Sequence, residues 1–101
     1  MRILVMFDLP VGTAAERREY TRFRKYLIKS GFMMLQESVY CKLAQNQQAA
    51  DSIIDNLYKN RPEDGLVQAL RVTEKQYSKM DYILGSVKSD VVDSDERIVF
   101  L

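Results

Sequence analysis

The segment that most constrains the fold runs from Ile3 to Phe7, five consecutive apolar residues near the start of the chain. It ends at Asp8-Leu9-Pro10, a sequence typical of a strand that leads into a loop. A strand in a sheet with one face in water alternates apolar and polar residues. This segment does not alternate, so both of its faces need cover. Either loops cover the second face, or a second copy of the chain packs against it; we favour the homodimer, because a domain this small gains much from a partner.

Local signals predict the other elements. Thr13 and Glu16 have the spacing of a capping box, which predicts a helix that runs to about Lys29 and ends at Ser30-Gly31. The further expected elements are strands at Phe32–Leu35 and Val39–Leu43, a helix at Asn46–Asn60, a strand at Leu66–Val72 after Gly65, and a short helical turn within Tyr77–Leu84.

The order of these elements predicts an α+β fold of the ferredoxin-like βαββαβ type. Its four-stranded antiparallel sheet carries both helices on one face, and the dimer is expected to pack sheet against sheet. Residues 1–84 form the predicted core domain and 85–96 a mobile linker. Residues 97–101 form a fifth strand at the C-terminus, which can be exchanged onto the partner protomer.

Composition excludes several kinds of chemistry and location. The chain has no histidine, which excludes histidine acid–base catalysis and the usual zinc sites. Cys41 is its single cysteine, so no internal disulfide forms and a reducing compartment is expected. No apolar run reaches the roughly 20 residues that span a bilayer. We therefore expect a soluble, cytoplasmic protein that does not bind membranes.

Asp8 is the candidate for chemistry, because its carboxylate leaves the sheet at a fixed position at the end of a strand. Two interpretations stay open. An aspartate before a proline-containing loop commonly accepts hydrogen bonds from local amides. Alternatively, Asp8 binds Mg²⁺, which typically uses one or two carboxylates together with waters and substrate phosphates. A twofold axis near Asp8 would bring a second copy of this carboxylate.

The first helix is strongly basic. Residues 13–30 contain six basic and two acidic residues, a net charge of +4. At about 100° per residue, four of the basic residues form one stripe: Arg18, Arg22, Lys25 and Lys29. With Arg17, they are the candidate contacts to nucleic-acid phosphates. An ordinary solvated helix face is the alternative, and the stripe alone does not decide between the two.

The chain resembles the CRISPR-associated protein 2 family over essentially its whole length. The resemblance is carried by the Met6-Phe7-Asp8-Leu9-Pro10 opening, which is most similar to members from type II systems, by the basic first helix and by Gln36-Glu37-Ser38-Val39-Tyr40. Many relatives have tyrosine at the position of Phe7.

The resemblance implies a ferredoxin-like homodimer that takes part in spacer acquisition, with Asp8 as the catalytic and metal-binding aspartate. It implies an endonuclease dependent on Mg²⁺, with Mn²⁺ as a substitute, that cleaves RNA or double-stranded DNA. It also implies a CRISPR integrase subunit as partner. A non-catalytic DNA scaffold that bridges the integrase stays open as the alternative. A small-ligand module would need a glycine-rich loop, which the sequence lacks.

Overall fold

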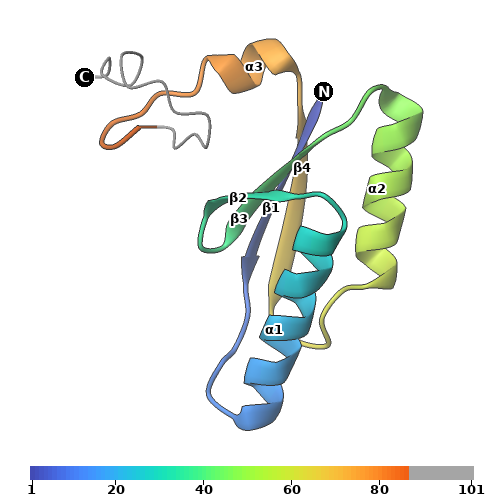
Figure 1. Cartoon of the computed structure of the whole chain (residues 1–101), viewed down its shortest axis with the longest axis vertical. Coiled ribbons are helices and arrows are strands. Elements are labelled where there is room, and N and C mark those ends of the chain that lie inside the picture. The colour runs from blue at the N-terminus through green and yellow to red at the C-terminus, as the bar shows by residue number, and fades with distance from the viewer. Residues whose placement is uncertain (87–101) are drawn as a thin grey trace.

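The computed structural model describes residues 1–86, which form one four-stranded sheet, two long helices and one short helix (Figure 1). The elements in order are β1 Arg2–Asp8, α1 Ala14–Lys29, β2 Met33–Gln36, β3 Val39–Leu43, α2 Gln47–Lys59, β4 Leu66–Val72 and α3 Glu74–Ser78. The sheet order is β2-β3-β1-β4 and every pairing is antiparallel. The predicted ferredoxin-like α+β fold is confirmed. The predicted strand at 97–101 and the linker after residue 86 lie outside the described residues.

Both long helices begin at capping residues. Thr13 accepts a hydrogen bond from the Glu16 amide, and the Glu16 carboxylate accepts one from the Thr13 amide, so the predicted capping box is present. Asn46 caps α2 through a hydrogen bond from the Ala49 amide. Gly31 follows α1 with φ of +93°, a left-handed conformation that glycine adopts without strain.

The short third helix begins earlier than predicted. The sequence placed a helical turn within Tyr77–Leu84, whereas α3 starts at Glu74. Thr73 and Gln76 form a second capping box, which fixes this start. The side chain of Tyr77 lies on the last turn of α3.

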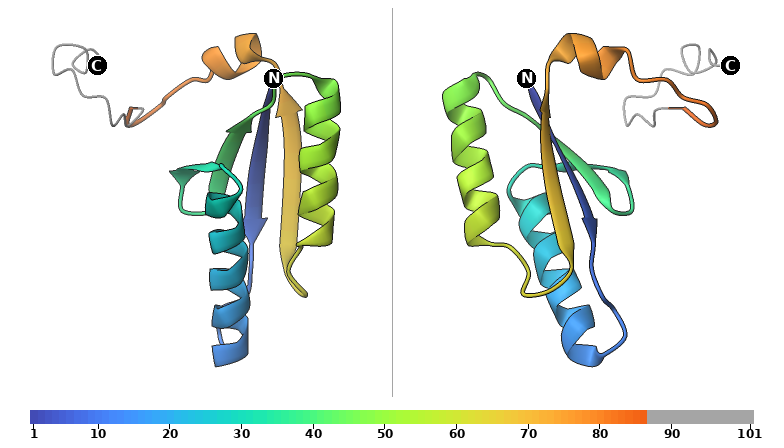
Figure 2. Two further views of the ribbon diagram at one scale, coloured as in Figure 1. Left: turned by 45° about the vertical axis from the view of Figure 1, so that its right-hand side comes forward. Right: turned by 180° about the vertical axis from the view of Figure 1, so that it is seen from behind.

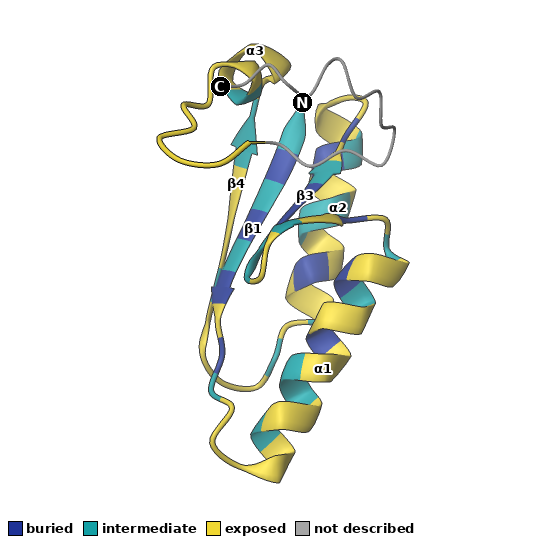
Figure 3. Ribbon diagram, turned by 60° about the vertical axis from the view of Figure 1, so that its left-hand side comes forward, coloured by how far each residue is buried: buried dark blue, intermediate teal, exposed yellow. Residues whose placement is uncertain are grey.

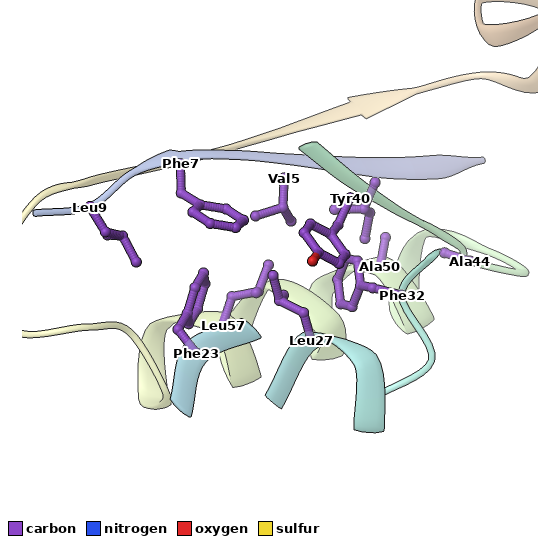
Figure 4. Close-up of a cluster of buried hydrophobic side chains, with 11 residues drawn as sticks. Val5, Phe7, Leu9, Phe23, Leu27, Phe32, Tyr40, Ala44, Ala50 and Leu57 are labelled. Carbon is purple, nitrogen blue, oxygen red and sulfur yellow. The ribbon is translucent and has the colours of Figure 1, made fainter. Parts of the chain in front are cut away.

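The hydrophobic core fills the space between the sheet and the two long helices (Figure 4). In that view β1 lies above the core, and α1 and α2 lie below it. The odd-numbered residues Ile3, Val5 and Phe7 of β1 are buried in this core. Phe7 makes edge-on ring contacts with Tyr20 and Phe23 of α1, which fix the end of β1 against that helix.

The opposite side of the sheet, which we call the open face, carries no helix among residues 1–86 apart from α3 at one end (Figure 2). Figure 3 shows β1 banded between buried and intermediate residues, because Leu4 and Met6 point to this face. The strand pairing adds these open-face residues: Arg2, Asp8, Met33, Val39, Cys41, Leu43, Leu66, Gln68, Leu70 and Val72. Most of them are apolar, so residues 1–86 by themselves leave a hydrophobic sheet surface without full cover.

Candidate functional site

Asp8 is the last residue of β1 and is exposed on the open face. Its neighbours hold the backbone from both sides. The Phe7 amide donates a hydrogen bond of 3.1 Å to the Ser38 carbonyl, at the turn between β2 and β3. On the other side Asp8 pairs with Leu66 at the start of β4. The carboxylate therefore projects from the end of a strand whose backbone is hydrogen-bonded on both sides, and the sequence predicted this strand-end position.

The Asp8 carboxylate accepts no hydrogen bond and joins no ion pair within residues 1–86. The alternative, in which local amides donate hydrogen bonds to this carboxylate, is therefore not found in the described part of the chain. Within the same residues, no group of three or more aspartate, glutamate or cysteine side chains could hold a metal ion. Residues 1–86 supply one carboxylate here, so a metal ion would need further ligands from outside that range.

The basic residues of α1 form a separate surface. Arg17, Arg18, Arg22 and Lys25 line one shallow hollow of about 610 Å³, together with Ala14 and Thr21. Lys29 lies one turn further along the same exposed stripe. Because Phe23 and Leu27 face the core, the stripe points away from the sheet. The structure thus brings four of the five candidate contacts together.

Two of these basic residues are already engaged with the protein. Arg22 forms an ion pair with Glu19, and its Nη2 donates to the carbonyls of Asn60 and Arg61 at 3.1 and 3.3 Å. The hydrogen bond from Arg22 lowers the pKa of Glu19 below its ordinary value. Arg22 therefore ties α1 to the C-terminal end of α2, a role that the sequence analysis missed because its partners are 38 and 39 residues away.

Arg17 is engaged more weakly, through hydrogen bonds of 3.2 and 3.4 Å to the carbonyls of Val11 and Gly12. Arg18, Lys25 and Lys29 have no hydrogen-bond or ion-pair partner among residues 1–86. Within the described part of the chain, these three side chains therefore remain open to an external anion.

Asp8 and the basic stripe do not form one pocket, because the carboxylate lies on the open face and α1 covers the other face. Arg18 comes nearest to a link between them. It lines a second hollow of about 290 Å³ together with Leu9 and Pro10, the residues that follow Asp8. The stripe thus begins beside the loop that leaves the candidate site.

The apolar part of the open face surrounds the strand that ends in Asp8. Leu66 and Leu70 on β4 are 54% and 52% exposed, and Leu43 on β3 is 57% exposed. Exposed apolar surface of this kind on a sheet typically marks an interaction site. Cys41 on the same face is buried, forms no disulfide and accepts a hydrogen bond from Arg2 at 3.8 Å. No helix within residues 1–86 is long and apolar enough to cross a membrane.

Comparisons with known proteins identify relatives of this chain. The model of the family described as CRISPR associated protein Cas2 matches residues 1–80. The chain is 54% identical to the CRISPR-associated endoribonuclease Cas2 of Treponema denticola, over 100% of both chains. It is 46% identical to the protein of the same name from Streptococcus mutans UA159, over 100% of this chain and 93% of the relative. The Lacticaseibacillus rhamnosus protein of that name is 42% identical over 100% of both chains.

Proposed function

Because the chain belongs to the CRISPR-associated protein Cas2 family, we propose that it is an endonuclease of CRISPR adaptation that works as a cytoplasmic homodimer on nucleic acid. The names of its relatives favour the nuclease over the purely non-catalytic scaffold. A scaffold role, in which the dimer bridges a CRISPR integrase subunit, is compatible with cleavage and forms the second part of the proposal.

The observation that carries the proposal is the Asp8 carboxylate, which is exposed, fixed at a strand end and unpaired among residues 1–86. Its oxygen donors suit Mg²⁺ or Mn²⁺, which accept one or two carboxylates and leave room for water and phosphate. Such an ion, when bound, supplies an activated water and neutralises charge on a phosphodiester. Asp8 would hold the ion, and no histidine in the chain offers another route.

The open face supports the homodimer. Its apolar residues need a partner surface of the same kind, and a second copy packed face to face provides one. A stable dimer of this type typically buries about 1,600 Å² in total. A twofold axis that passes near the end of β1 would place two Asp8 carboxylates at one site.

The stripe on α1 supports binding to RNA or duplex DNA. Arg18, Lys25 and Lys29 would contact phosphates directly, while Arg17 and Arg22 would add charge from positions that also stabilise the fold. Such contacts are independent of sequence and weaken steeply with salt. Replacement of Arg18 and Lys25 by alanine should therefore flatten the salt dependence without disturbing the link between Arg22 and α2.

The test compares cleavage of RNA and duplex DNA by wild type and Asp8→Asn, with Mg²⁺, Mn²⁺ or EDTA. The matched control is Asp55→Asn, which removes an exposed carboxylate from α2. We expect Asp8→Asn to lower the cleavage rate by at least about 100-fold and Asp55→Asn to leave it unchanged. Cleavage by Asp8→Asn at the wild-type rate would overturn the assignment of Asp8. Duplex binding without metal-dependent cleavage by wild type would leave the scaffold as the function.

A further inference from the structure

Gly65 lies against the backbone of Asp8, a contact made possible by its lack of a side chain. A Cβ atom at position 65 would lie 2.7 Å from the Asp8 carbonyl oxygen, 2.8 Å from Leu9 Cδ2 and 3.1 Å from Leu9 Cα. The first and third of these atoms belong to the main chain, so they cannot rotate away as the end of a flexible side chain can. Any residue other than glycine would therefore require the Asp8–Leu9 backbone or the turn at position 65 to shift.

The backbone conformation adds to this requirement. Gly65 has φ of +100°, in the left-handed region that L-residues rarely adopt. Its amide donates a hydrogen bond of 2.8 Å to the Asp64 carboxylate, which holds the turn before β4. The next residue, Leu66, is the pairing partner of Asp8. The turn and the candidate site are thus in direct contact through the first pair of the β1–β4 ladder.

We propose that Gly65 is a positioning residue for Asp8. The bare backbone at position 65 lets the turn press against Asp8 and Leu9, and this contact determines where the Asp8 carboxylate leaves the sheet. The inference rests on the proposed function, in which Asp8 holds the metal ion. A displacement of about 1 Å matters there, because Mg²⁺ demands near-ideal octahedral geometry and misplacement of this size can cost about 100-fold in rate.

The chain contains a matched control for backbone strain. Gly31 has φ of +93°, close to that of Gly65. A Cβ at position 31 would meet only the Lys42 side chain, at 3.5 and 3.7 Å, which is ordinary contact with a flexible end. Alanine at either position introduces a similar φ penalty, but only alanine at 65 places a Cβ against the backbone of the residue that carries the carboxylate.

The experiment compares Gly65→Ala with Gly31→Ala in the full chain. We expect Gly65→Ala to lower the cleavage rate by about 10- to 100-fold and to raise the Mg²⁺ concentration that gives half-maximal rate. Gly31→Ala should change neither beyond twofold. Without metal, NMR should show shifted Asp8 and Leu9 amide resonances in Gly65→Ala and unshifted ones in Gly31→Ala. Affinity for duplex DNA should stay within twofold of wild type in both.

Asparagine variants cover the case in which Gly65→Ala does not fold. Asparagine tolerates positive φ better than alanine does yet brings the same Cβ, so Gly65→Asn and Gly31→Asn repeat the comparison with less strain. Equal cleavage, metal requirement and amide shifts in the paired variants would overturn the inference. So would folding of both Gly31 variants when neither Gly65 variant folds, because Gly65 would then serve folding alone. If Asp8→Asn cleaves normally, the proposed function fails; if it is inactive while Gly65→Ala behaves as Gly31→Ala, only the Gly65 inference fails.

Discussion

The charged residues at the two ends of β1 lie in opposite kinds of surroundings. At the start, Arg2 Nε donates to both carboxylate oxygens of Glu74, at 3.0 and 3.1 Å, and its guanidinium lies 4.1 Å from the centre of the Tyr77 ring. At the other end, six residues away on the same open face, Asp8 has no partner within residues 1–86. α3 supplies the partners of Arg2, whereas residues 1–86 supply none for Asp8.

The surroundings of Arg2 stabilise its charge beside the apolar open face. Burial alone would lower the pKa of Arg2, but hydrogen bonds to Cys41 and Glu74 and the charge of Glu74 outweigh it, so its pKa lies above the ordinary value. A charge beside an apolar surface is stabilised by such partners. Asp8 borders the same apolar surface without them. Its partner therefore lies outside residues 1–86, and in our proposal it is a second copy of the chain together with a metal ion.

The largest expected effect is on the stability of the proposed dimer. Leu70→Lys places an ammonium group on the open face, where a second sheet would bury it without a partner. An uncompensated buried charge costs about 3–5 kcal/mol, so the dissociation constant of the dimer should rise at least about 100-fold. Ala69→Lys is the control, because Ala69 is exposed on the other face of the same strand. Analytical ultracentrifugation of the two variants measures the effect, and a wild-type chain that is monomeric at micromolar concentration would contradict the proposal.

A smaller effect concerns Asp8 and metal. Wild type should gain about 2.7 kcal/mol of unfolding free energy when Mg²⁺ is present at a hundredfold excess over its dissociation constant. Asp8→Asn should gain nothing. Without metal the variant should be no less stable than wild type, because it removes repulsion between two facing carboxylates. Denaturant unfolding with Mg²⁺ or EDTA tests this, with Asp55→Asn as a control that should respond as wild type does. Equal stabilisation of Asp8→Asn would place the metal elsewhere.

The sequence predicted the elements well where the signals are local. The Thr13–Glu16 capping box fixed the start of α1, and β4 has the predicted bounds, Leu66–Val72. The third helix begins earlier than predicted, because the prediction did not include the capping-box spacing of Thr73 and Gln76. Strand-end position was enough to identify Asp8 as a candidate.

The relations that could not be predicted are those between distant segments. The close approach of Gly65 to Asp8 brings together the start of β4 and the end of β1, and the residue pattern of neither strand predicts it. The hydrogen bonds of Arg22 to the end of α2 are of the same kind, and they made a residue of the basic stripe a structural one as well. Whether Asp8 would find an amide partner depended on how the neighbouring turns are oriented, which only the folded chain determines.

A third prediction tests the paired end of β1. Glu74→Ala removes both hydrogen bonds to Arg2 and leaves its charge beside the apolar face. We expect a loss of about 0.5–1 kcal/mol of unfolding free energy, because Glu74 is half exposed, at 51%. Cleavage and duplex binding should not change, since α3 is far from Asp8 along the strand. Lys75→Ala on the same helix is the control for denaturant unfolding. A loss of activity in Glu74→Ala would show that the two ends of β1 are coupled.

The smallest expected effect is a loss of unfolding free energy at alkaline pH, which we expect to come from Tyr77 at the Arg2 end of β1. Burial raises the pKa of Tyr77 above its ordinary value of 10.0; the nearby groups Cys41, Tyr82 and Glu74 raise it further, and Arg2 opposes the shift. A tyrosine whose folded pKa is raised keeps its proton longer in the folded state, so stability is complete below pH 10 and falls as the pH rises above it.

Tyr77→Phe tests this effect, because phenylalanine keeps the ring that lies beside Arg2 and removes the hydroxyl that ionises. Between pH 9 and pH 11, the unfolding free energy of wild type should fall further than that of Tyr77→Phe, as measured by denaturant unfolding. The difference should be less than about 1 kcal/mol, because the ring is only partly buried. Tyr58→Phe is the control, since Tyr58 is 65% exposed on α2, and it should follow the wild-type curve. An alkaline loss that persists in Tyr77→Phe would assign it to another group. A loss abolished by Tyr77→Phe would assign the alkaline sensitivity to the Arg2 end of β1. In our proposal the Asp8 end responds instead to metal and to the second copy.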